Sequence, residues 1–115
     1  MTVTIYHNPR CSKSRQTLAL VEESGAKPEV IKYLRTPPSA KDLDAILKKL
    51  GKEPRELMRK KEPPYAALNL ADDTKSRAAL IDAMVENPVL IERPIVLANG
   101  KAAIGRPPEA VLAIL

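Results

Sequence analysis

The opening of the chain alternates strand, helix and strand signals, and this order constrains the fold more than any other feature. Val3–His7 is short, β-rich and bounded by the turn signal Asn8-Pro9. A helix is predicted from Ser12 to about Glu23, stopping near Gly25, and a second strand over Glu29–Leu34. Two strands joined through a helix favour parallel pairing by a right-handed crossover.

The middle of the chain predicts helices separated by proline pairs. After Pro37-Pro38, Ser39 supplies a helix-start signal, and an apolar face at helical spacing ends before Gly51. That face consists of Leu43, Ile46, Leu47 and Leu50. Pro54 suits the first turn of a short helix carrying Leu57 and Met58, and Pro63-Pro64 is predicted to break it. A further helix, predicted around Ser76–Glu86, ends at Asn87-Pro88 and has the apolar face Leu80, Ile81, Met84 and Val85.

The end of the chain predicts a hairpin and a last helix. Ile95–Leu97 is a buried-looking strand, Asn99-Gly100 is a strong hairpin turn, Lys101–Ile104 returns, and a helix runs from Glu109 to Leu115. The complete order matches the α/β thioredoxin-like plan. We therefore expect one domain over residues 1–115, with a mixed four-stranded sheet and an inserted helical subdomain at about 36–88.

Composition removes several classes of function. The 115 residues include no Phe, no Trp and three Tyr, which predicts an aliphatic core and argues against modules that stack bases on aromatic side chains. The net charge is +5, but basic residues alternate with acidic ones, so no nucleic-acid partner is expected. There is no apolar run of about 18–20 residues and no secretory signal. We therefore expect a cytoplasmic protein without a membrane partner.

Cys11 is the one cysteine, and it lies between a strand end and a helix start. A thiol there faces free backbone N–H groups and the positive end of the helix dipole. Arg10, Lys13 and Arg15 add positive charge nearby. These surroundings favour a thiolate of lowered pKa. The alternative is an inert cysteine buried in the core.

The pattern Cys11-x-x-Ser14 is that of a monothiol, so any redox cycle needs a second thiol from outside the chain. His7 is the one histidine, and it either bonds the turn at the strand end or acts on Cys11 by tuning the thiol or carrying its proton. No metal site is expected, because structural zinc requires four such ligands. Thr17 stands where a phosphatase of the Cys-x5-Arg kind has arginine, which disfavours that chemistry.

Three arginines from separate segments could converge on one tetrahedral oxyanion. Arg59 lies in a basic cluster at a helix end, while Arg93 and Arg106 each precede a proline at the end of a strand. The arginine fork binds oxyanions in a bidentate manner, which lysine cannot match. Each arginine taken alone is more simply explained as a solvated surface residue.

Taken together, these motifs resemble the glutaredoxin-coupled arsenate reductase (ArsC) family, in its compact YfgD-like branch. The resemblance covers nearly the whole chain and rests on motifs in the same order and spacing. They are His7-Asn8-Pro9-x-Cys11-Ser-x-Ser14-Arg15, Tyr33-Leu34-x-Thr-Pro37-Pro38, Leu57-Met58-Arg59-Lys60, Arg93-Pro94-Ile95-Val96 and Arg106-Pro107.

The resemblance implies a thioredoxin-like fold and a set of residue roles. Cys11 matches the family's nucleophile, and His7, Ser14 and Arg15 match positions that surround and activate the thiolate. The three oxyanion-binding arginines match Arg59, Arg93 and Arg106. Pro94 falls where this fold usually carries a cis-proline beside the active cysteine.

The activity implied is reduction of arsenate to arsenite through a thiol–arsenate adduct on Cys11. Glutathione acts as co-substrate, glutaredoxin regenerates the thiol, and no bound cofactor is expected. A monomer is expected. Two alternatives stay open on the same fold: a monothiol oxidoreductase that removes glutathione from proteins, and a regulatory module that binds RNA polymerase. The regulatory branch uses a Cys-x-x-Cys pair, which Ser14 interrupts here.

Overall fold

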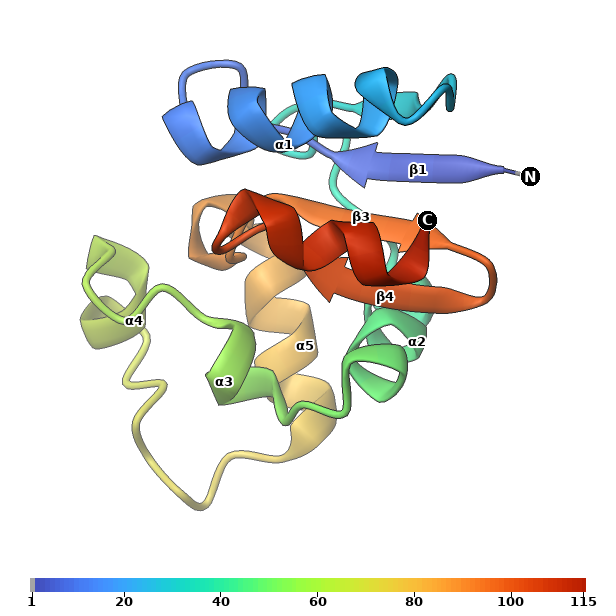
Figure 1. Cartoon of the computed structure of the whole chain (residues 1–115). Helices are drawn as coiled ribbons and strands as arrows, with labels where there is room; N and C mark the ends of the chain where they lie inside the picture. The colour runs from blue at the N-terminus through green and yellow to red at the C-terminus, as the bar shows by residue number, and fades with distance from the viewer. Residues whose placement is uncertain (1) are drawn as a thin grey trace. The chain divides into compact units, whose positions relative to one another are not determined.

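A computed structural model describes residues 2–115 of the protein and contains a four-stranded mixed sheet (Figure 1). The strand order is β2-β1-β3-β4, and β1 pairs parallel with β2 and antiparallel with β3, which pairs antiparallel with β4. The mixed sheet expected from the sequence is therefore confirmed. The strands are β1 (Val3–Tyr6), β2 (Glu29–Ile31), β3 (Ile95–Ala98) and β4 (Lys101–Ile104).

The chain divides into two units. The first contains the sheet and combines the N-terminal segment through Thr36 with Arg93–Leu115, and the second is the helical segment Pro37–Glu92. In the first unit, α1 (Ser12–Glu23) connects β1 to β2 as predicted, and Gly25 follows it with a φ of 92°. The last helix, η2 (Pro108–Ile114), is a 3-10 helix that begins one residue before the predicted start.

The core of the sheet unit is built from alternate strand residues and two helices. Val21 of α1 and Val111 of η2 are fully buried in one cluster with residues of β1 and β3, namely Val3, Ile5, Val96 and Ala98. This cluster is aliphatic, as the composition predicts. Tyr33 is also buried, so the protein's interior is not purely aliphatic.

The second strand is shorter than the predicted Glu29–Leu34 and ends at Ile31. The carbonyl of Lys32 accepts hydrogen bonds from the N–H groups of both Arg35 and Thr36, each at 3.0 Å. These bonds close a turn, so the chain leaves the sheet although its side chains still have strand character. Leu34 is consequently exposed.

The helical unit follows the predicted pattern in its two longer helices. These are α2 (Ala40–Leu50) and α5 (Arg77–Glu86). The Ser39 hydroxyl accepts the Asp42 N–H at 3.1 Å at the start of α2, and Gly51 ends that helix with a φ of 66°. The buried residues of the two helices are Leu43, Ile46, Leu47, Leu80, Ile81, Ala83 and Met84.

Proline begins short helices in this unit more often than the sequence analysis expects. Pro54 opens α3 (Pro54–Leu57), as predicted, but Pro63-Pro64 is not a break: it opens α4 (Pro63–Ala67). Pro88 likewise opens η1 (Pro88–Leu90). The physical reason is that a first-turn N–H has no partner within the helix, so proline loses nothing there.

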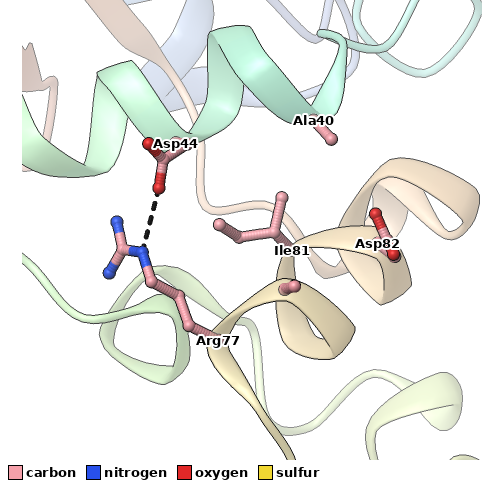
Figure 2. Close-up of a pocket in the computed structure, with 6 residues that line it drawn as sticks. Ala40, Asp44, Arg77, Ile81 and Asp82 are labelled. Atoms are coloured by element: carbon pink, nitrogen blue, oxygen red, sulfur yellow. Dashed lines mark hydrogen bonds and ion pairs between the residues drawn. The ribbon is translucent and has the colours of Figure 1, made fainter.

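An ion pair joins α2 and α5 beside a small pocket (Figure 2). Arg77 Nε donates to Asp44 Oδ1 at 2.9 Å, and Lys48 Nζ lies 3.0 Å from the other carboxylate oxygen. Ala40 and Ile81 supply much of the remaining lining. The residues that line this pocket include no cysteine and no histidine.

Candidate active site

Cys11 lies at the junction between the end of β1 and the start of α1. Its N–H donates to the Asn8 carbonyl at 3.0 Å, which closes the turn, and its own carbonyl accepts the Arg15 N–H at 3.0 Å as the first helical bond. Cys11 is thus the N-cap residue of α1, with extended backbone angles. Its residual exposure is 8%, so the thiol is shielded yet reachable at the surface.

The surroundings of Cys11 favour the thiolate. Burial raises the pKa of the thiol, but the backbone N–H groups of Ser14 and Lys13 and the charges of Arg93 and Arg106 together lower it below its ordinary value. The sulfur makes no full capping hydrogen bond. The N–H dipoles at the helix start nevertheless stabilise negative charge on it. A lowered pKa increases the fraction of nucleophilic thiolate at neutral pH.

Arg93 and Arg106 reach Cys11 because the terminal hairpin brings them together. Ile95 of β3 pairs with Ile104 of β4, so the residues just outside this pair are neighbours. Arg106 Nε donates to the Arg93 carbonyl at 2.9 Å, and Arg106 Nη2 donates to Cys11 Sγ at 3.6 Å. Of the three predicted oxyanion-binding arginines, Arg106 therefore contacts the candidate nucleophile and Arg93 acts on it through its charge.

Both prolines that follow these arginines have cis peptide bonds. The Arg93–Pro94 bond is cis, at the position that the resemblance singles out, and the Arg106–Pro107 bond is cis as well. The second cis bond was not anticipated from the sequence.

His7 and Ser14 form a buried pair across the turn that contains Cys11. The Ser14 hydroxyl oxygen lies 2.7 Å from His7 Nδ1 and accepts the Asn8 N–H at 3.0 Å. Burial lowers the pKa of His7, and the charges of Lys32 and Arg15 lower it further, so the ring is neutral at pH 7. The contact links the end of β1 to the first turn of α1 and thereby fixes the turn that presents Cys11.

Arg15 supports the same turn from outside. Its Nη1 donates to the Pro9 carbonyl at 2.9 Å, and its side chain is otherwise exposed. Its charge acts on His7, whose pKa it helps to lower. In this arrangement the Arg15 side chain stabilises the turn before Cys11 through the Pro9 carbonyl.

Arg59 belongs to the helical unit. Its N–H donates to the Leu90 carbonyl at 2.7 Å, next to a bridge between Met58 and Ile91. Its guanidinium forms ion pairs with Glu62 at 3.6 Å and Glu92 at 3.8 Å. The structure thus shows Arg59 partnered by two carboxylates, and its part in oxyanion binding stays a prediction.

Sequence reasoning missed three residues that shape this site. Asn8 Oδ1 accepts the Arg10 N–H at 3.0 Å and so stabilises the turn before Cys11. Thr17 is fully buried in α1 and contacts Gly105, which is 88 positions away in the sequence. The Asn-Pro signal could have indicated the role of Asn8, but no local pattern reports so distant a contact.

Residues 2–115 contain no group of three or more His, Cys, Asp or Glu side chains placed to hold a metal ion. Within the same range, every helix is too short or too polar to cross a membrane.

Comparison with known proteins points to one family. The ArsC family model matches residues 6–114. A protein of Escherichia coli K12 named uncharacterized protein YfgD is 63% identical, over 98% of this chain and 96% of its own. A Haemophilus influenzae protein named arsenate reductase is 52% identical over the full length of both chains.

The solved structures agree. An arsenate reductase from Vibrio cholerae superposes with a TM-score of 0.96 at 58% identity, covering 100% of this chain and 98% of that one. The mixed sheet and this likeness together establish the thioredoxin-like fold. The extent of these matches, together with the family motifs present around the thiol and the hairpin arginines, shows that the chain belongs to the ArsC family.

Proposed function

We propose that this protein reduces arsenate to arsenite, with Cys11 as the nucleophile and with glutathione and glutaredoxin as the sources of the resolving thiols. One observation carries the proposal: the thiol of Cys11, at the start of α1, lies 3.6 Å from the Arg106 guanidinium. The names of the relatives at about half identity or more favour arsenate over other oxyanions.

In the first step the Cys11 thiolate attacks the arsenic of a bound arsenate. A sulfur–arsenic bond forms, one arsenic–oxygen bond breaks, and the departing oxygen leaves as water after protonation, with arsenic still in its +5 state. Arg93 and Arg106 are proposed to bind the remaining oxygens and to offset the negative charge that gathers during the attack, and the contact between Arg106 and Cys11 supports this role. The family resemblance adds Arg59 as the third oxyanion-binding arginine.

In the second step the thiol of glutathione attacks the Cys11 sulfur. A disulfide between Cys11 and glutathione forms, the sulfur–arsenic bond breaks, and its electron pair stays on arsenic, which leaves as arsenite. A glutaredoxin thiol then removes the glutathione and restores the Cys11 thiol. An external thiol is required because Cys11 is the one cysteine of the sequence. The reducing cytoplasm is the compartment that supplies glutathione.

His7, Ser14 and Arg15 are proposed to support this chemistry by holding the turn that presents Cys11. Because His7 is neutral, it adds no charge of its own to the thiolate. Its contact with Ser14 instead keeps the start of α1 directed at the sulfur.

A coupled assay tests the proposal. Purified protein is incubated with arsenate, glutathione, glutathione reductase and glutaredoxin, and NADPH oxidation is followed by absorbance. We expect an arsenate-dependent rate that disappears in the Cys11→Ser variant and also without glutaredoxin. An equal rate in the Cys11→Ser variant would refute the assignment of Cys11 as the nucleophile. Turnover of a glutathionylated protein without any response to arsenate would favour the deglutathionylase alternative instead.

A further inference from the structure

Gly105 makes an unusually close contact between the end of the hairpin and α1. A Cβ atom at this position would lie 2.8 Å from Pro94 Cγ and 2.9 Å from Thr17 Cγ2, and it would overlap Thr17 Oγ1. Gly105 is also not among the glycines with positive φ. Its backbone conformation therefore suits any residue, and the glycine is needed for space alone.

Thr17 cannot easily move away from this contact. Its side chain is fully buried, and its hydroxyl donates to the Lys13 carbonyl at 2.8 Å on the preceding turn of α1. The same oxygen lies 3.5 Å from the Gly105 carbonyl. Rotation of the threonine would break the first bond and leave a buried hydroxyl without a partner.

The segment that carries Gly105 also carries the arginine at the thiol. The Gly105 N–H donates to the Pro94 carbonyl at 2.9 Å, which fixes the segment to the start of β3. Arg106 follows at once and places Nη2 at the Cys11 sulfur. Cys11 itself is the N-cap of α1, the helix that Gly105 touches. A shift of the segment away from α1 would therefore move the guanidinium away from the sulfur.

We propose that Gly105 is a positioning residue, whose missing side chain lets the end of β4 lie against Thr17 and so sets the Arg106 guanidinium on the Cys11 thiol. The proposal deepens the proposed function, and it rests on that function for its biological meaning. The distance between charge and sulfur is held by packing between two elements, and not by the arginine side chain alone.

The reactivity of Cys11 reports on this arrangement without any substrate. The groups that act on the sulfur are the N–H groups of Ser14 and Lys13 from α1 and the charges of Arg93 and Arg106 from the two ends of the hairpin. Displacing the Gly105 segment moves the charge of Arg106, which follows Gly105 directly in the sequence, and leaves the helix part in place. Since the chain has one cysteine, alkylation by iodoacetamide measures this thiol alone.

The experiment measures the alkylation rate against pH for Gly105→Ala, for the double variant Thr17→Ala/Gly105→Ala, and for Gly105→Ala in an Arg106→Ala background. We expect Gly105→Ala to raise the pKa of Cys11 and to lower the alkylation rate at pH 6.5 roughly threefold to fivefold. Thr17→Ala removes two of the three clashing atoms and should restore most of the rate. In the Arg106→Ala background, Gly105→Ala should have no further effect on the pKa.

Two results would overturn the proposal: an unchanged pKa in folded Gly105→Ala, or a pKa shift that persists in the Arg106→Ala background. Circular dichroism verifies folding. If Gly105→Ala does not fold, the double variant decides, with a pKa near that of the wild type supporting the proposal and a raised pKa refuting it. If the wild type does not turn over arsenate but these pKa changes are observed, the proposed function is refuted and the positioning role of Gly105 is still supported.

Discussion

Replacing Arg106 by alanine removes the guanidinium that donates a hydrogen bond to the Cys11 sulfur, and its effect on the thiol pKa can be worked from the geometry. At the observed 3.6 Å, two unit charges attract by about 4–5 kcal/mol at an effective dielectric constant of about 20 and by about 1 kcal/mol in water. Arg106 is exposed, so the solvent screens most of this attraction. We expect the thiolate to lose about 1–2 kcal/mol, which lowers the ratio of thiolate to thiol roughly tenfold at a given pH and so raises the pKa of Cys11.

The assay is the pH dependence of iodoacetamide alkylation, or of thiolate absorbance near 240 nm, in wild type and Arg106→Ala. The matched control is Lys27→Ala, which removes the same net charge from an exposed site before β2. Cys11 follows the end of β1, and β1 and β2 are parallel, so Lys27 lies toward the opposite end of the sheet. An upward shift in Arg106→Ala alone supports a local contact. Equal shifts in both variants, or none, would refute the reasoning.

Three further predictions concern stability, measured by urea unfolding. Ser14→Ala leaves His7 Nδ1 and a turn N–H without their partner, and should lower the free energy of unfolding by about 2 kcal/mol. The pKa of His7 is lower in the folded protein than in the unfolded chain, so the unfolded chain takes up a proton first as pH falls below about 6.5. The free energy of unfolding should therefore decline below that pH, and it should decline less in His7→Gln. Hydrogen bonds to Lys48 and Arg77 lower the pKa of Asp44. The wild type should therefore have a higher free energy of unfolding than Asp44→Asn at pH 7, and this difference should vanish as pH falls below about 4.

Local signals in the sequence predicted the elements that such signals control. Ser39 and Gly51 bound α2 as expected, because a hydroxyl caps the helix start and a glycine with positive φ ends it. Asn99 and Gly100 form the hairpin turn, both with positive φ. The second strand was predicted too long because the turn at Lys32 depends on backbone hydrogen bonds, and side-chain pattern does not report these.

The site was predictable in its chemistry and less so in its geometry. The strand–turn–helix setting indicated a low thiol pKa at Cys11, and the Arg-Pro motifs indicated arginines at strand ends. The pairing that joins Arg93 to Arg106 depends on hairpin register, which the turn signal made foreseeable. The contact between Thr17 and Gly105 results from packing between segments that are distant in the sequence, and neither residue type predicts it.

The central claim, that the Cys11 thiolate attacks arsenate and passes the product to glutathione, is tested most directly by intact-protein mass spectrometry. The protein is incubated with arsenate and reduced glutathione and without glutaredoxin, so that the proposed disulfide cannot be removed. We predict a single added glutathione, less the two hydrogens lost on disulfide formation, which maps to Cys11 and appears only when arsenate is present. The same mass with and without arsenate, or no added mass at all, would contradict the account.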